Sequence, residues 1–250
     1  MTIRVGINGF GRIGRMVFRA AQDFDDIEVV GINDLLDPEY LAYMLKYDSV
    51  HGRFKGDVAV EGNTLKVNGT NMRLTAERDP SALKWDEIDV YVGIEATGLC
   101  LTKETAQKHI DAGAKKVIIS APAADADATV VYGVNQDVLT SACQIISNAS
   151  CTTNCLAPVA KILNDEIGIE LGSMTTIHAL TNDQSIHDVY HSDIYRARSA
   201  GQSMICTKTG AAQAVGLELR ELSDKLDGRA GRVSPAIVSF LDFTFVIHRD

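Results

Sequence analysis

The first half of the chain alternates between short apolar runs and segments whose apolar residues recur at helical spacing. The apolar runs have the length and composition of buried strands: residues 2–8, 27–34, 89–98, 115–122, 129–135 and 144–150. Helical spacing follows the first run at 15–24 and recurs at 102–113, where Gly113 is typical of a residue just past a helix end. Because helices separate the strands, we expect βαβ units and a parallel sheet.

Residues 57–74 interrupt this order, because apolar and polar positions alternate there around Gly62-Asn63 and Asn68-Gly69. A period of two around such dipeptides is typical of a β-hairpin. The sequence therefore predicts an antiparallel excursion from the parallel sheet.

The pattern changes after Cys151. A helical segment at about 152–166 leads to long β-rich segments at 170–180 and 236–248. Long strands without helices between them predict a mixed or antiparallel sheet. We therefore expect an α/β chain in which a second domain begins after residue 150.

Composition limits the kind of protein. The chain has 250 residues, 46% hydrophobic and 23% charged, which is ordinary for a soluble globular protein of one or two domains. A net charge of −9 argues against nucleic-acid binding, which needs a basic face. No apolar run reaches the ~18 residues of a membrane span, and the N-terminus lacks a signal peptide's apolar block. The five cysteines have no disulfide-framework spacing, so we expect a cytoplasmic chain with reduced thiols and no membrane partner.

Residues 9–14 read GFGRIG, in which Gly9, Gly11 and Gly14 form a G-x-G-x-x-G pattern. The pattern follows a predicted strand, opens a helix, and precedes a strand that ends at Asp34, which is the full dinucleotide-binding arrangement. The glycines would let the backbone approach a pyrophosphate at the helix N-terminus. Asp34 would accept hydrogen bonds from ribose hydroxyls and repel a 2′-phosphate, which favours NAD over NADP. The alternative is a structural turn with a surface aspartate.

Cys151 lies in SNASCTTNCLAP, residues 148–159, directly after Ser150 at the start of the predicted helix. A helix N-terminus stabilises a thiolate, so the position suits a nucleophile. A metal pair with Cys155 is disfavoured, since no second ligand pair has zinc-like spacing. We expect Cys155 to be a packed core thiol.

A thiolate nucleophile needs a base, and two histidines illustrate the choice. His178 closes the apolar strand MTTIHAL, where its side chain would project into a crevice. His109 lies between charged residues of the predicted helix, and we expect it on a solvated face. His178 is therefore the candidate partner of Cys151.

Together INGFGRIGR, the ND pair at 33–34, SNASCTTNCLAP, TTIHALT and TGAAQAVG resemble the glyceraldehyde-3-phosphate dehydrogenase family, in its order and spacing. The resemblance implies a Rossmann-type NAD-binding domain at 1–150 and an α+β catalytic domain at 151–250. It implies oxidation of a phosphorylated aldehyde with NAD and inorganic phosphate, in a homotetramer when the chain is full length. Cys151 would form a thioester, with His178 as its base.

The resemblance also implies roles for further residues. Positions that match cofactor contacts beside Asp34 are Arg12, Ile13, Arg78 and Ser120. Positions that match the two phosphate sites and the substrate contacts are Thr181 and Arg232 for the substrate phosphate, Ser150, Thr209 and Gly210 for inorganic phosphate, Arg196 for anions nearby, and Thr152 for substrate. Each such residue type is otherwise commonly a cap or a surface residue.

The chain departs from the family at several points. Cys206 replaces a usual proline, so we expect a thiol without function in a loop, and Arg232 stands in RVSP instead of RVPT. The family continues past FLDFTFVIHRD, for about a quarter of its length, and that part includes the asparagine that holds the nicotinamide amide. The resemblance therefore implies a catalytic domain incomplete at its C-terminus, with NAD binding but little turnover.

Three alternatives remain. Residues 182–195 resemble erythrose-4-phosphate dehydrogenase, a close relative with the same nucleophile, whereas TGAAQAVG favours the glycolytic enzyme. The chain could also be a catalytically impaired NAD-binding fragment. A cysteine hydrolase is the third alternative, which the dinucleotide pattern disfavours.

Overall fold

The computed structural model describes residues 2–207 and 209–247, and the chain forms two compact units. Unit 1 comprises Met1–Thr129 and Asp137–Asn148, and unit 2 comprises Val130–Gln136 and Ala149–Asp250. Among the described residues, none of the helices has the length and hydropathy needed to cross a membrane.

The sheet of unit 1 is mostly parallel, as predicted. Its described strands follow the order β10-β11-β9-β8-β1-β2-β7-β6-β5. Their bounds are β1 Ile3–Asn8, β2 Ile27–Asn33, β5 Val58–Glu61, β6 Thr64–Val67, β7 Thr70–Thr75, β8 Val92–Glu95, β9 Lys116–Ile119, β10 Ala128–Thr129 and β11 Ile145–Ser147. Strands β5, β6 and β7 pair antiparallel, which confirms the predicted hairpin and extends it by one strand, and β7 joins β2 in parallel.

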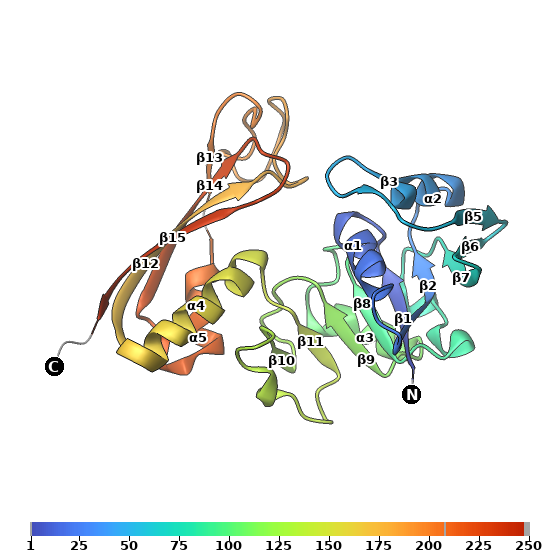
Figure 1. Cartoon of the computed structure of the whole chain (residues 1–250), viewed down its shortest axis with the longest axis horizontal. Helices are drawn as coiled ribbons and strands as arrows, with labels where there is room; N and C mark the ends of the chain where they lie inside the picture. Colours follow the sequence, from blue (N-terminus) through green and yellow to red (C-terminus); the bar gives the residue numbers. More distant parts are fainter. Residues whose placement is uncertain (1, 208, 248–250) are drawn as a thin grey trace. The chain divides into compact units, whose positions relative to one another are not determined.

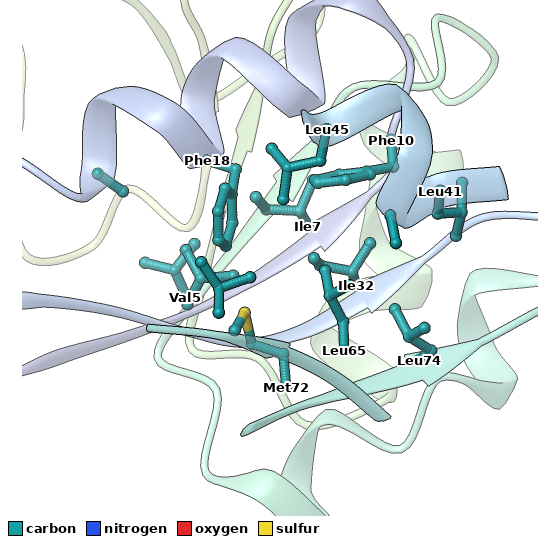
Figure 2. Packing of buried hydrophobic residues seen from close by; sticks show 14 of the residues in the cluster. Val5, Ile7, Phe10, Phe18, Ile32, Leu41, Leu45, Leu65, Met72 and Leu74 are labelled. Carbon is teal, nitrogen blue, oxygen red and sulfur yellow. The ribbon is translucent and has the colours of Figure 1, made fainter. Parts of the chain in front are cut away.

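Helices cover both faces of this sheet (Figure 1). They are α1 Arg12–Ala21, α2 Pro38–Lys46 and α3 Lys103–Asp111, with 3-10 turns at Pro80–Ala82, Trp85–Ile88 and Gln136–Val138 and a small ribbon of β3 Tyr47–Asp48 and β4 Gly52–Arg53. Figure 2 shows the core of one face, where Phe18 of α1 and Leu45 of α2 lie over Ile7 and Ile32. Helices on both faces of a parallel sheet make a doubly wound, Rossmann-type fold.

The opposite face corrects one prediction. His109 of α3 is fully buried, not solvated. Its ring lies nearly parallel to that of Trp85, with the ring centroids 6.5 Å apart, and its Nε2 lies 3.0 Å from a carboxylate oxygen of Glu95. The charged neighbours in the sequence suggested a surface position, but His109 lies on the same helix face as Ala106, which faces the sheet.

Unit 2 has the predicted mixed sheet, in the order β13-β14-β12-β15. The strands are β12 Ile169–Ala179, β13 Ile205–Thr207, β14 Leu226–Val233 and β15 Phe240–Ile247. Only the β12–β14 pair is parallel among them. Helices α4 Cys151–Ile167 and α5 Ala211–Glu218 lie side by side (Figure 1), and a 3-10 turn follows at Arg220–Leu222. Leu156 of α4, Val215 of α5 and Met174 of β12 share the core.

The strand predicted at 129–135 is wrong for most of its length. Strand β10 ends at Thr129, and the following residues turn back, with Val134 N–H bonded to the Val131 carbonyl. The side chain of Asn135 also accepts a hydrogen bond from Val131 N–H. Val131 is buried in the core of unit 2, so these apolar residues fill a turn instead of a strand.

Two cysteines also lie in surroundings that differ from the prediction. Cys155 is exposed, because the buried stripe of α4 runs through Leu156 and Ala160 on another face of the helix. Cys206 lies in β13, opposite Gly231 of β14, and not in a loop.

Candidate active site

The glycine segment connects β1 to α1 at the carboxyl end of the sheet. Gly9 has a φ of +89°, and a Cβ there would lie 2.7 Å from the backbone nitrogen of Thr97. A Cβ on Gly14 would lie 2.0 Å from the Gly9 carbonyl oxygen. A larger residue at Gly14 would push the first turn of α1 away from the strand, and one at Gly9 would clash with the loop at Thr97, which explains these two glycines.

Asp34 follows the last residue of β2 and fixes the loop beside it. One carboxylate oxygen accepts a hydrogen bond of 2.7 Å from Phe10 N–H, and the other accepts one of 3.1 Å from Leu36 N–H. Asp34 also lines a hollow of about 390 Å³, together with Gly9, Gly11 and Arg78. The hollow thus combines accessible loop backbone, a carboxylate for ribose hydroxyls and a cation, which fits an adenine dinucleotide.

Four other predicted cofactor residues do not line this hollow: Arg12, Ile13, Gly14 and Ser120. Arg12 forms an ion pair of 2.5 Å with Asp48, Ile13 is half exposed, and the Ser120 N–H donates to the Glu95 carbonyl. The structure therefore brings together Gly9, Gly11, Asp34 and Arg78 of the predicted set, and places the rest around them.

Cys151 is the first residue of α4, as the sequence predicts. Ser150 caps the helix, because its Oγ accepts a hydrogen bond of 3.0 Å from Thr153 N–H. Ala149, one residue earlier, has a φ of +55°, a left-handed conformation that is costly for a residue with a Cβ. This sharp entry leaves the Cys151 side chain exposed at the helix N-terminus.

His178 lies near the carboxyl end of β12 and faces the thiol. Its Nε2 is 3.1 Å from Cys151 Sγ. The ring is buried, and this burial, with the positive charge of Arg232, lowers the pKa of His178 below 6.5 despite the opposing hydrogen bond to Ala179. His178 is therefore neutral at pH 7 and has a lone pair to accept a proton.

Arg232 lies beside His178, because the two residues are register neighbours on the parallel strands β14 and β12. One guanidinium nitrogen is 2.5 Å from His178 Nδ1 and 3.3 Å from the Ala179 carbonyl oxygen. Nδ1 also lies 2.7 Å from that oxygen, so its proton state selects between accepting from Arg232 and donating to Ala179. Burial lowers the pKa of Arg232, and its Nε is buried without a hydrogen-bond partner among the described residues.

The predicted anion residue Arg196 is already engaged within unit 2. Its guanidinium lies 2.6 Å from an Asp183 carboxylate oxygen and donates to the hydroxyl of Thr207. Thr181 donates from both its N–H and its hydroxyl to the side-chain oxygen of Gln184. Sequence reasoning missed Asp183 and Gln184, although both occur in the NDQ that directly follows Thr181.

The remaining predicted phosphate residues lie at helix starts. Thr209 and Gly210 precede α5, where the Thr209 hydroxyl accepts from Ala211 N–H. Ser150 is the N-cap of α4, as Gly210 is of α5. Thr152 is buried on the inner face of α4, which does not favour direct contact with a substrate.

Comparison with known proteins agrees with this arrangement. Residues 3–103 match the family described as glyceraldehyde 3-phosphate dehydrogenase, NAD binding domain, and residues 150–250 match its C-terminal domain. The glyceraldehyde-3-phosphate dehydrogenase of Bacteroides fragilis is 59% identical over 250 residues, which cover 99% of this chain and 75% of that protein. The protein of that name from Geobacillus stearothermophilus is 56% identical over 251 residues, covering 100% and 75%. Glyceraldehyde-3-phosphate dehydrogenase A of Escherichia coli is 58% identical over 245 residues, covering 98% and 74%.

Proposed function

Because the chain belongs to the glyceraldehyde-3-phosphate dehydrogenase family, and hence to the NAD-dependent oxidoreductases, we propose that it oxidises glyceraldehyde 3-phosphate through a thioester on Cys151. The product of this phosphorylating reaction is 1,3-bisphosphoglycerate, which implies inorganic phosphate as the second substrate. The observation that carries the proposal is the 3.1 Å contact between Cys151 Sγ and His178 Nε2 at a helix N-terminus.

The geometry supports the role of general base for His178. With the Nδ1 proton donated to the Ala179 carbonyl, the Nε2 lone pair faces the thiol. His178 takes the thiol proton as Cys151 Sγ bonds to the aldehyde carbon, and returns it to the aldehyde oxygen, which gives a hemithioacetal. NAD, when bound, supplies the acceptor for the hydride that leaves this carbon. His178 takes up the hydroxyl proton in that step, so a thioester remains on Cys151.

Inorganic phosphate then completes the reaction. A phosphate oxygen bonds to the thioester carbon, the carbon–sulfur bond breaks, and Cys151 leaves as the thiolate, which the helix N-terminus stabilises. The residues that match the inorganic-phosphate site lie at the starts of α4 and α5, and a helix N-terminus favours a bound anion. Arg232 lies beside His178, and its Nε has no hydrogen-bond partner among the described residues, so the guanidinium suits the phosphate of the substrate.

We also propose the homotetramer that the family resemblance implies. Sedimentation equilibrium over a range of concentrations tests the tetramer, and a monomer at all concentrations contradicts it.

The five cysteines are all free thiols, which favours a reducing compartment such as the cytoplasm.

Omitting inorganic phosphate tests the thioester. With NAD and glyceraldehyde 3-phosphate alone, we expect one equivalent of NADH per chain and an acyl mass adduct on Cys151, which phosphate should discharge. Cys151→Ser should give neither the NADH nor the adduct. NADH formation without an adduct would contradict the covalent route.

Two further measurements complete the test. Erythrose 4-phosphate should be oxidised less efficiently than glyceraldehyde 3-phosphate, and the reverse preference would assign the chain to the related enzyme.

Iodoacetamide should modify Cys151 before Cys155 and Cys206, which are also exposed. If peptide mapping finds either of those two first, Cys151 is not the activated thiol.

A further inference from the structure

A row of polar side chains is buried at the carboxyl ends of four neighbouring strands in unit 1. Glu95 of β8, Asn8 of β1, Asn33 of β2 and Thr75 of β7 are register partners in turn. Glu95, Asn8 and Asn33 are each at most 4% exposed. Buried polar groups are costly unless each finds a partner, so the row demands a reason for its presence.

The Glu95 carboxylate is the centre of the row. One oxygen accepts hydrogen bonds from Asn8 Nδ2 at 2.7 Å and lies 3.0 Å from His109 Nε2. The other oxygen accepts from Thr97 N–H at 2.8 Å and from the Thr97 hydroxyl. Glu95 therefore joins β1, α3 and the loop that follows β8.

His109 is set to donate to Glu95. The indole Nε1–H of Trp85 lies 3.1 Å from His109 Nδ1, and an indole N–H only donates. Nδ1 is therefore the acceptor, and the ring proton resides on Nε2, which faces Glu95. Burial alone would raise the pKa of Glu95, but hydrogen bonds from His109, Thr97 and Asn8 outweigh it and lower the pKa. Glu95 is thus a buried anion with a donor in each direction.

The row continues to the other side of the hollow. Asn8 Oδ1 accepts from Asn33 Nδ2 at 2.7 Å, and Asn33 Oδ1 accepts from Glu77 N–H at 2.8 Å. Asn33 Nδ2 also donates to the Glu77 carbonyl at 2.9 Å, so both backbone groups of the residue before Arg78 are fixed. Through these bonds one carboxylate is connected to the backbone on either side of the cofactor hollow.

We propose that Glu95 is a positioning residue for NAD: its charge holds the loop at Thr97 and, through Asn8 and Asn33, the segment before Arg78 in the arrangement that binds the cofactor. Thr97 and Arg78 line the hollow, whereas Glu95 lies beneath it. Burial and then the charge of Glu95 raise the pKa of Cys100, which also lines the hollow, to about 11. The inference rests on NAD binding by the family and not on the proposed aldehyde chemistry, and binding is measured without turnover.

Glu95→Gln tests the role of the charge. The amide has the same shape but presents an N–H group to donors, so at least one hydrogen bond is lost or opposed. We expect calorimetry to show NAD affinity reduced by roughly tenfold or more. The matched control is Val67→Ala, a buried truncation on β6 that should lower the melting temperature and leave NAD affinity unchanged. Equal NAD affinity in Glu95→Gln and the parent would reduce the row to a structural element and overturn the proposal.

A second pair of variants keeps the test decisive if Glu95→Gln does not fold. Thr97→Val removes the hydroxyl but keeps the shape, and Thr97→Ser keeps the hydroxyl. We expect Thr97→Val to lose NAD affinity by several fold and Thr97→Ser to retain it. Trp85 is the single tryptophan of the chain, so its emission reports the His109 contact directly. Emission should shift in Glu95→Gln and not in Val67→Ala, and equal NAD affinities for the two Thr97 variants would contradict the link to the loop.

Discussion

Glu95 beneath the cofactor hollow and Arg232 beside the thiol both carry charge away from solvent, but their surroundings differ. The Glu95 carboxylate has a donor in every direction. Arg232 is half-buried, shares His178 Nδ1 and the Ala179 carbonyl, and has a buried Nε with no partner among the described residues. The charge of Glu95 is fully hydrogen-bonded within the protein, whereas Arg232 keeps one donor, its Nε, that could bond a ligand.

The two sites also differ in the structural elements that position their residues. The hollow of unit 1 is shaped by strand register, since each residue of its polar row lies opposite the next. The thiol site of unit 2 depends on one helix start, one strand end and a few side-chain contacts. We therefore expect substitutions in unit 1 to change cofactor affinity and those at the thiol site to change the chemistry or the recognition of anions.

The largest effect should follow Cys151→Ser. A hydroxyl is a much weaker nucleophile than a thiolate, so we expect aldehyde oxidation to fall by roughly a thousandfold or more. NAD affinity should be unchanged, because none of the hollow's lining belongs to unit 2. A steady-state assay measures the rate of aldehyde oxidation, and calorimetry on the same preparation measures NAD affinity. A loss of NAD affinity as large as the loss of rate would show that the two regions do not act separately.

His178→Asn should come next. Removing a general base typically costs 10²–10⁴-fold in rate. Because burial and Arg232 lower the pKa of His178, the acid limb of kcat/KM in the parent should lie below pH 6.5 and should vanish in the variant. The stability that neutral His178 contributes is full above pH 6.5 and is lost as pH falls through the folded pKa. An acid limb above pH 6.5, or one that persists in His178→Asn, would assign the base elsewhere.

Arg232→Ala examines the unsatisfied donor. Loss of a charge-assisted hydrogen bond costs about 1.5–3 kcal/mol, so phosphorylated aldehydes should lose roughly ten- to a hundredfold in kcat/KM. Unphosphorylated glyceraldehyde, which lacks the phosphate, should lose far less. An equal loss with both aldehydes would mean that Arg232 acts on His178 and not on substrate.

Asp34→Ala concerns the edge of the hollow. Both carboxylate oxygens also accept hydrogen bonds from the neighbouring loop, so we expect NAD to bind roughly tenfold more weakly. The difference in affinity between NAD and NADP should become smaller, because the charge that repels a 2′-phosphate is lost. Calorimetry with both cofactors measures this. Equal affinities for NAD and NADP in the parent would refute the role of the Asp34 charge.

Asp183→Asn should have the smallest effect on stability. Its carboxylate is 45% exposed where it pairs with Arg196, and exposed pairs contribute about 0.2–1 kcal/mol. The melting temperature should therefore change little, whereas it should fall in Glu95→Gln, which takes a fully buried charge from its donors. A loss as large as that of Glu95→Gln would show that exposure does not separate the two regions.

The sequence was informative where periodicity decides the structure. The alternation of apolar runs and helical spacing predicted the parallel sheet, and the glycine spacing predicted the first turn of α1. It failed for β14, which contains Gly228 and Gly231 among charged residues and forms a strand because β12 lies beside it. Helix α2 was missed although Asp37 caps it and Pro38 opens it, a pairing typical of helix starts.

The site residues show the same limit. Cys151 and His178 follow from a helix start and a strand end, and the structure brings their side chains together. The burial of His109 could not be read from its sequence neighbours, because Trp85 and Glu95, which receive it, come from other elements. Cys155 was misplaced because a helix position four residues from Cys151 does not by itself indicate which face is buried.

The segment Val130–Gln136 interrupts unit 1 in the sequence, and this has a consequence for synthesis on the ribosome. This segment belongs to unit 2 but emerges before Asp137–Asn148, the last part of unit 1. Val131 is covered by the core that contains Leu156, which is made later. Unit 1 can therefore complete its sheet only after Val130–Gln136 of unit 2 has left the ribosome. Until Leu156 is made, the side chain of Val131 lacks the core that buries it. A nascent chain stopped near residue 150 should then be a client for chaperones that bind exposed apolar segments.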